Sequence, residues 1–411
     1  MVSGDLLNDI QIREVTPDRL EELLLPIMNA MGWVGSHEQR ENLLRQPEFD
    51  FRLGAWEGDS IVGGVGAFSF DVTVPGGAPA PSAGLSMVGV HPTHRRRGVL
   101  TELVRAHIDT VRERGQVASL LWATEGRIYG RFGYGMASLQ CEMRIDRDGV
   151  HFAGDDDEPV GRFRLLDARD ALDYVRAIWE VVRKQRAGML SRSREWWEQR
   201  RVSDPPFLHG QPPLQRAVLD IDGQLAGYAL YRQHGNWEDG VAAGELEVVE
   251  AFGVTPVANR ELWRFLFGID LVRWVKHSLA PIDHPLLFLL AEPARLRMRA
   301  KDGLWVRLVD AEAALARRRY GDGGGVVLDL VDPFCPWNEG RFRVTEEGAR
   351  RTDFEPDIRL GAAELGSVYL GGFSFAALRD AARVEELRPG GVERADQLFG
   401  VDLAPWCPEV F

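Results

Sequence analysis

The chain has 411 residues, and its 49 Lys and Arg against 62 Asp and Glu give a formal net charge of −13. This length exceeds one ordinary domain and predicts two or three. The negative charge argues against a nucleic-acid binder, because phosphate binding needs a basic surface. A hydrophobic fraction of 45% is ordinary for packed cores and excludes wholesale disorder.

The cysteines and the apolar stretches bear on the compartment. Cys141, Cys335 and Cys407 are widely spaced and odd in number, which favours neither a disulfide framework nor a metal site. The start of the chain lacks a secretory-signal pattern, and no apolar run reaches the ~18 residues of a membrane helix. We therefore expect a cytoplasmic protein without a metal or a membrane span.

The first segment, residues 1–146, predicts a mixed α/β domain from its hydrophobic periodicity and its Gly/Pro turns. The expected elements in chain order are a helix over 18–31, strands over 52–56 and 61–70, a loop over 75–84, a strand over 85–90, a helix over 100–111 and a strand over 117–122.

The second segment, residues 147–297, repeats this order in outline and so predicts an internal duplication. Its expected elements are helices over 168–184 and 194–201, a hairpin over 217–231 turning at Asp222-Gly223, a strand over 246–251, a helix over 261–267 and a strand over 286–290.

The third segment, residues 298–411, predicts an α+β module. Its expected elements are strands over 305–308, 325–331 and 341–344, and helices over 311–318, 362–365, 375–382 and 394–399. The chain ends apolar, from Ala404 to Phe411, whereas chain ends are usually polar and frayed. We therefore expect the terminus to be docked.

The strongest local signal is Arg95-Arg96-Arg97-Gly98, which stands between a predicted strand and a predicted helix. Free N–H groups at a helix start bind anions, and glycine permits close approach of the backbone to a ligand. The pattern indicates a pyrophosphate site, but a solvated charge run is about equally compatible with these residues alone. It matches neither a Walker loop nor a GxGxxG turn, and the second segment lacks it.

A family resemblance decides between these alternatives. Arg95-x-x-Gly98 resembles the acetyl-CoA pyrophosphate loop of GNAT N-acetyltransferases, with Leu100 where a small residue is usual. The stretches from Ser86 to Leu100 and from Glu125 to Gly135 resemble the enhanced intracellular survival (Eis) family. The resemblance implies mixed-sheet α/β folding: two GNAT-type domains, the second degenerate, and an α+β domain like sterol carrier protein 2.

The resemblance also implies roles for individual residues. Tyr129 would be the general acid and the carboxylate of Phe411 the general base. Trp33 and Glu409 would contact the substrate. The residues expected to bind acetyl-CoA are Val88, Gly89, Val90, Arg95, Arg96, Arg97, Gly98, Val99, Leu100, Thr101, Thr124 and Glu125.

The chemistry is consistent with these roles. Acetyl transfer needs a neutral amine and a base within hydrogen-bond reach of it. A terminal carboxylate is a weak base, so burial beside Trp406 and Phe411 should raise its pKa. The three cysteines lie in no nucleophile motif, which favours direct transfer without an acyl-enzyme.

We therefore predict an acetyl-CoA-dependent N-acetyltransferase for primary amines of polycationic small molecules, with aminoglycosides as the first candidates. Two alternatives stay open: a protein lysine acetyltransferase, and a lipid or sterol carrier with vestigial acetyl transfer. The resemblance further implies a homohexamer.

Overall fold

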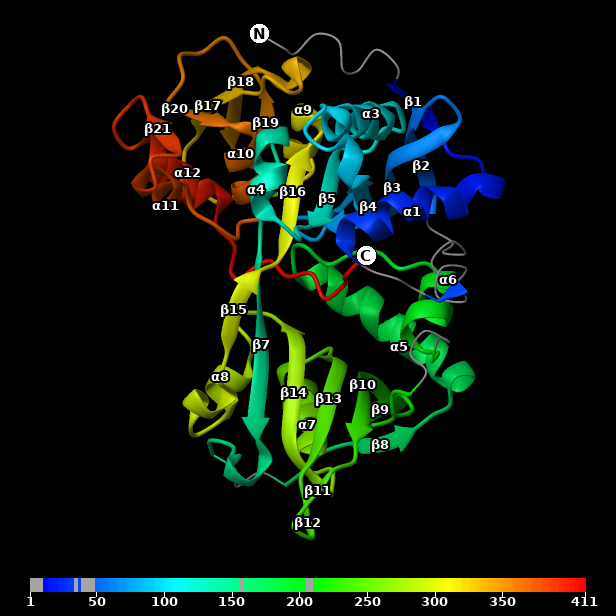
Figure 1. Cartoon of the computed structure of the whole chain (residues 1–411). Coiled ribbons are helices and arrows are strands. Elements are labelled where there is room, and N and C mark those ends of the chain that lie inside the picture. Colours follow the sequence, from blue (N-terminus) through cyan, green and yellow to red (C-terminus); the bar gives the residue numbers. More distant parts are fainter. Residues whose placement is uncertain (1–9, 33–35, 38–48, 155–157, 205–209) are drawn as a thin grey trace. The chain divides into compact units, whose positions relative to one another are not determined.

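The structure, a computed structural model, describes residues 10–32, 36–37, 49–154, 158–204 and 210–411 (Figure 1). The chain forms two compact units that are interleaved in sequence. The first holds the residues up to Ala137, together with Leu304–Gly400 and Val410–Phe411, and the second holds Ser138–Gly303 and Val401–Glu409. The second unit is therefore inserted into the chain of the first.

A seven-stranded sheet in the order β1-β2-β3-β4-β5-β16-β6 forms the core of the first unit (Figure 1). Its strands are β1 (Ile10–Glu14), β2 (Phe49–Glu57), β3 (Ser60–Thr73), β4 (Pro79–Val90), β5 (Ala118–Trp122), β6 (Gly135–Met136) and β16 (Leu304–Leu308). Neighbours pair antiparallel except β4 and β5, which are parallel. Strand β16 comes from beyond the inserted unit and completes this sheet.

Helices α1 (Leu20–Met31) and α3 (Val99–Glu113) cover opposite faces of this sheet. A Cβ on Gly63 would point at Leu103 of α3, whereas a Cβ on the next residue, Gly64, would overlap with Leu23 of α1. Successive strand residues face opposite sides, so this pair of glycines lets both helices approach closely. The short helix α4 (Gly126–Tyr129) follows β5.

The rest of the first unit is a smaller five-stranded sheet in the order β19-β18-β17-β20-β21 with four helices. Its elements are α9 (Ala311–Leu315), β17 (Val326–Val331), β18 (Gly340–Thr345), β19 (Gly348–Arg351), β20 (Ile358–Gly361), α10 (Ala362–Tyr369), α11 (Phe375–Asp380), β21 (Val384–Glu386) and α12 (Gly391–Phe399). Helix α10 packs on β6 and β16, because a Cβ on Gly135 or Gly366 would overlap with backbone across that contact.

The second unit has a seven-stranded sheet in the order β15-β7-β14-β13-β10-β9-β8. Its strands are β7 (Leu139–Asp146), β8 (Arg162–Leu165), β9 (Gln215–Ile221), β10 (Gln224–His234), β13 (Gly244–Gly253), β14 (Val272–Ala280) and β15 (Arg299–Asp302), with a small ribbon of β11 (Trp237–Glu238) and β12 (Val241–Ala242). Its helices are α5 (Ala168–Val182), α6 (Arg194–Trp196, continued by a π-helical turn over Trp197–Arg201), α7 (Pro256–Phe267) and α8 (Leu286–Leu289).

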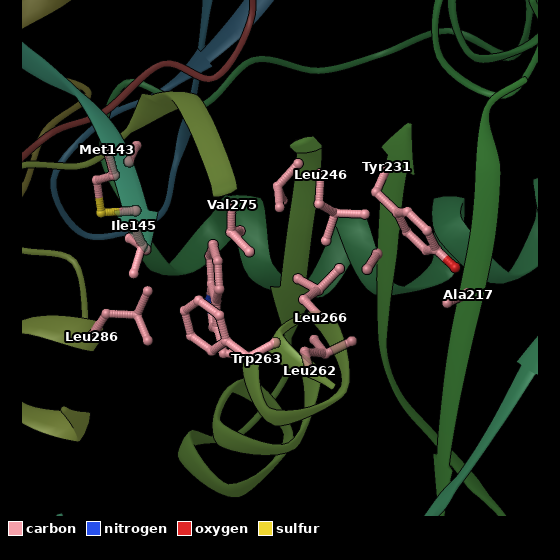
Figure 2. Packing of buried hydrophobic residues seen from close by; sticks show 14 of the residues in the cluster. Met143, Ile145, Ala217, Tyr231, Leu246, Leu262, Trp263, Leu266, Val275 and Leu286 are labelled. Atoms are coloured by element: carbon pink, nitrogen blue, oxygen red, sulfur yellow. The ribbon is translucent and has the colours of Figure 1, made fainter. Parts of the chain in front are cut away.

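Helices α5 and α7 lie on opposite faces of this second sheet. Val218 belongs to the core under α5, whereas its neighbours Ala217 and Leu219 belong to the core under α7. Figure 2 shows the α7 side, where Trp263 and Leu266 meet side chains from five strands. The arrangement matches that of the first unit, as the predicted duplication requires.

Two local predictions were wrong. Most of the expected loop over 75–84 belongs to β4. Its prolines are compatible with a strand because Pro79 and Pro81 lie on the same side of it. The Pro81 carbonyl accepts from the amide of Val117, so the missing proline N–H falls on the side away from β3. The expected strand over 286–290 is the helical turn α8, since so short an apolar run does not distinguish helix from strand.

The predicted division into 1–146, 147–297 and 298–411 stays a prediction. In the structure, β7 joins the sheet of the second unit, while β16 joins that of the first.

Candidate active site

Strands β4 and β5 separate partway along β4. They pair only from Ser82 to Gly84, although β4 continues to Val90 along β3. A bulge lies in the unpaired part, where Met87 has a positive φ of 50°. Beyond Gly84, β4 therefore presents a backbone edge that β5 does not cover. An extended ligand can pair with such an edge as an added strand.

The arginine turn leads into the 15-residue helix α3 at the end of β4. Gly98 caps the helix with φ of 87°, and no side chain caps its first amides. Glu57, at the end of β2, accepts hydrogen bonds from His94 (3.0 Å) and Arg97 (3.1 Å), which lower the pKa of Glu57. Arg95 donates to the carbonyl of Ala30 (3.2 Å). These bonds hold the turn, and the helix start can receive an anion.

Tyr129 is the last residue of α4 and is 7% exposed. Burial and the charge of Glu125 raise the pKa of Tyr129 to about 12, so the phenol keeps its proton at neutral pH. Its ring lies edge-on to that of Tyr134, with centroids 6.0 Å apart. Thr124 and Glu125 are exposed just before this helix.

A buried chain of hydrogen bonds links Tyr134 to His107 through Ser119. The Tyr134 hydroxyl is 2.7 Å from Ser119 Oγ, which is 2.8 Å from His107 Nε2. Burial lowers the pKa of His107 to about 3, so the imidazole is neutral. Nothing in the spacing of these three residues along the sequence predicts the hydrogen-bonded chain.

The last residue of the chain lies where β4 and β5 separate. The Phe411 ring is 5.3 Å from that of Phe70 and 6.5 Å from that of Phe68, both on β3. A Cβ on Gly84 would come within 2.8 Å of the Phe411 ring. The expected docking of the terminus is therefore present.

Glu409 lies in the second unit and is completely buried, at 0% exposure. It forms ion pairs with Arg192 (2.6 Å) and Arg201, and Arg192 also pairs with buried Glu250 (2.6 Å). Burial alone would raise the pKa of Glu409, but the two arginines outweigh it and lower that pKa. This environment points to anchoring of the terminal segment instead of the predicted substrate contact.

Trp33 lies outside the described residues. Within the described ranges, no group of three or more His, Cys, Asp or Glu side chains is arranged to hold a metal ion. None of the described helices has the length and apolarity needed to cross a membrane.

The antiparallel strands, the parallel β4–β5 pair that separates, and the helix α3 that connects these two strands are the features of a GNAT acetyltransferase. Residues 11–137 and 188–308 each match an acetyltransferase (GNAT) domain family, and residues 311–408 match the sterol carrier protein domain family. The predicted fold class is thus confirmed: an acetyl-CoA-dependent acetyltransferase with two GNAT domains and a carrier-like module.

The whole-chain comparisons give the family. The chain is 33% identical over 372 residues to N-acetyltransferase Eis of Mycobacterium tuberculosis, covering 86% of each chain. It is 41% identical over 394 residues to an uncharacterised N-acetyltransferase of Streptomyces avermitilis, covering 94% of this chain and 95% of the other. The crystal structure of Eis1 from Mycobacterium abscessus superposes with a TM-score of 0.85 at 32% identity, covering 98% of this chain and 100% of that chain. This chain belongs to the Eis family of N-acetyltransferases.

Proposed function

We propose that this protein transfers acetyl from acetyl-CoA directly to a primary amine of a polycationic small molecule, with aminoglycosides as the first class to test. The observation that carries the proposal is the position of Phe411, whose ring packs over Gly84 at the opening between β4 and β5. This ring position supports a role for the terminal carboxylate at the opening beside the uncovered β4 edge.

The acetyl-CoA assignment rests on two adjoining features. The backbone of Val88, Gly89 and Val90 would pair with the pantetheine arm along the uncovered edge of β4. The turn and first helical residues would bind the pyrophosphate through amides and guanidinium groups, and the exposed Thr124 and Glu125 would lie further along the cofactor. The residues proposed for the pyrophosphate are Arg95, Arg96, Arg97, Gly98, Val99, Leu100 and Thr101.

In the proposed reaction, the amine nitrogen attacks the acetyl carbonyl, a C–N bond forms and the C–S bond breaks. The Phe411 carboxylate takes the proton that the amine loses, directly or through one water. Tyr129, whose phenol is protonated at neutral pH, gives its proton to the departing thiolate.

Direct transfer in a ternary complex is favoured over an acyl-enzyme by the state of the cysteines. All three are buried. Burial raises the pKa of Cys141 and Cys335 to about 11 and that of Cys407 to about 12. They are therefore thiols at neutral pH, and a thiol is a poor nucleophile compared with a thiolate.

The decisive experiment removes the terminal carboxylate from its place. A chain that ends at Val410, and a chain with one glycine added after Phe411, should lose about a hundredfold or more in kcat. Both should bind acetyl-CoA normally. Val410→Ala, which changes an exposed side chain and keeps the terminus, is the matched control. Normal turnover by the extended chain would overturn the role of the carboxylate.

Acceptor and kinetic tests address the rest. Comparing kcat/KM on aminoglycosides and on lysine peptides separates the small-molecule function from lysine acetylation. Lipid that co-purifies with a chain unable to turn over acetyl-CoA would support the carrier alternative. Intersecting initial-rate plots are expected for a ternary complex. A cytoplasmic homohexamer remains a prediction of the family resemblance.

A further inference from the structure

The second unit contains a cavity of about 470 Å³ at the place that corresponds to the acetyl-CoA opening of the first. Strands β13 and β14 pair in parallel only from Gly244 to Val248, whereas β13 continues to Gly253 along β10. The cavity lies where they separate, beside the start of α7 and the segment that leads to α8.

This cavity is not a second pyrophosphate site. Pro256, at the first position of α7, has no N–H, and the Thr255 hydroxyl already accepts from the amide of Ala258. The Asn259 side chain accepts from the amide of Gly253 at 2.9 Å. Pro256 thus offers no N–H, and the amides of Gly253 and Ala258 are already bonded to side chains, so the cavity suits a different kind of ligand.

Two buried histidines, His277 and His284, line the cavity and are 4% and 6% exposed. His277 Nδ1 is 2.9 Å from the carbonyl of Val248, so it carries the proton and donates. His284 Nδ1 accepts from the amide of Leu286 at 3.2 Å. Burial lowers the pKa of His277 to about 4 and that of His284 well below its usual value. Both rings are therefore neutral, with their tautomers fixed by these bonds.

With these tautomers, the two Nε2 atoms have complementary hydrogen-bonding roles. His277 Nε2 is an acceptor, and His284 Nε2–H is a donor. Within the described part of the chain, neither Nε2 has a hydrogen-bond partner. The ring centroids are 6.3 Å apart, and both rings lie against Trp263. The Trp263 indole, visible in Figure 2 beside Val275 and Leu262, forms the common wall between cavity and core.

The rest of the wall is mainly apolar. Met189, Phe252 and Trp406 line it, and Phe288, 84% exposed, is another of its lining residues. Arg186, the lining guanidinium, is paired with Asp283 at 2.7 Å. A cavity of this size and lining is typical of small-molecule sites, in which a few polar groups orient an apolar ligand.

We propose that this cavity binds a neutral, mostly apolar small molecule whose hydroxyl or carboxamide group donates to His277 Nε2 and accepts from His284 Nε2–H. The site is separate from the acetyl-transfer site and does not depend on the proposed function. Leu403 and Trp406 of the terminal segment are among its lining residues, so an occupant touches the segment that precedes Glu409.

The test is calorimetric titration of the full chain with four matched probes. 2-Naphthol and 2-naphthamide carry the required group, 2-methylnaphthalene lacks it, and naphthalene-2-sulfonate is an anion. We expect the first two to bind about tenfold more tightly than the other two, as one satisfied pair of buried hydrogen bonds implies. Equal affinity for all four, or tightest binding of the sulfonate, would overturn the proposal.

Variants of the lining residues test whether the probes bind in this cavity. His277→Phe and His284→Phe keep a ring and remove the Nε2 group, and each should reduce naphthol affinity to that of methylnaphthalene. Leu289 is a partly exposed residue of the cavity wall, and Leu289→Trp should prevent binding of every probe. This variant tests the location of binding even if a histidine variant fails to fold. His234→Phe, which changes a histidine of the same unit away from the cavity, is the control. Unchanged naphthol affinity in Leu289→Trp would place the probe elsewhere and overturn the proposal.

Discussion

Gly84 leaves the space that the last side chain of the protein occupies. Its missing Cβ would lie 2.8 Å from the Phe411 ring and 2.7 Å from the Phe70 ring, closer than carbon atoms pack. Both rings are fixed by neighbours, so a methyl group there must displace the terminal residue.

We therefore expect Gly84→Ala to reduce kcat by about tenfold or more, since small misplacements of a catalytic group are costly. Steady-state kinetics would measure this. The double variant Gly84→Ala/Phe411→Leu has a smaller terminal side chain and should be no slower than Phe411→Leu alone. A wild-type kcat for Gly84→Ala would contradict the placement of the carboxylate at this opening.

Tyr129, at the end of α4, and its ring neighbour Tyr134 allow a matched comparison. Tyr129→Phe should lower kcat by about 10²–10⁴ with little change in the KM for acetyl-CoA, because only the proton donor is lost. Tyr134→Phe breaks the bond to Ser119 and should mainly lower thermal stability. The reverse pattern, with Tyr134→Phe the slower enzyme, would assign the acid to Tyr134.

At the scale of elements, acetyl-CoA binding at the start of helix α3 can be tested by comparing substitutions at the two ends of the helix. Gly98 and Gly115 both have positive φ, at 87° and 71°, so alanine should strain the backbone by about 1 kcal/mol at either position. Only Gly98→Ala should weaken acetyl-CoA binding, because only that end of the helix faces the proposed pyrophosphate. Titration with acetyl-CoA distinguishes the two, and equal weakening would show a general effect of helix stability.

The terminal segment is fixed by buried charges of the second unit. Glu409→Gln leaves Arg192 with less negative charge beside it, and loss of one partner of a buried pair costs about 3–5 kcal/mol. A marked fall in the unfolding temperature is expected. Glu292→Gln removes a partner from the half-exposed pair with Arg295 and should change little. Similar small shifts in both variants would show that Glu409 is not an anchor.

Local patterns made the elements around the opening predictable. The periodicity of α3 and the arginine turn before it are each continuous in sequence, so these elements could be placed from sequence alone. Val272–Ala280 was missed because polar residues such as Arg273 and Lys276 hide its strand character, and the apolar run at 286–290 was taken in its place.

Long-range packing accounts for the remaining differences. The seat of Phe411 depends on Gly84 and Phe70, and the burial of Glu409 depends on arginines about two hundred residues away. The spacing of residues along the sequence does not predict such long-range contacts. The roles of Tyr129 and Phe411 came from family resemblance, and they stay predictions that the proposed kinetics test.

At the scale of the whole molecule, buried neutral histidines make stability depend on pH. The pKa of His107 is lowered to about 3 and that of His277 to about 4, against about 6.5 in an unfolded chain. Below about pH 6.5 the unfolded chain binds protons that the folded chain does not, so acid favours unfolding. Above that pH these groups have no effect.

Each such histidine should lower the free energy of unfolding by up to about 1.4 kcal/mol per pH unit below its unfolded pKa. Denaturant unfolding between about pH 7 and pH 5 would measure the slope. His107→Gln can keep a bond to Ser119 and lacks the titrating ring, so its slope should be smaller. An identical slope in the variant would mean that His107 is protonated in the folded protein.

Because one unit is inserted within the other, the strands of the acetyltransferase sheet are not all translated consecutively. Ala137 and Leu304 are joined by a backbone hydrogen bond of 2.9 Å, and the strands on either side of that bond belong to one sheet. A ribosome adds about 5–20 residues per second, so β16 is translated about 8–33 s after Ala137. During that interval the nascent chain exposes an unpaired strand edge, which is a site for misassembly or for a chaperone. Most of the inserted unit, Ser138–Gly303, is translated in this interval, and the acetyltransferase sheet can close only afterwards.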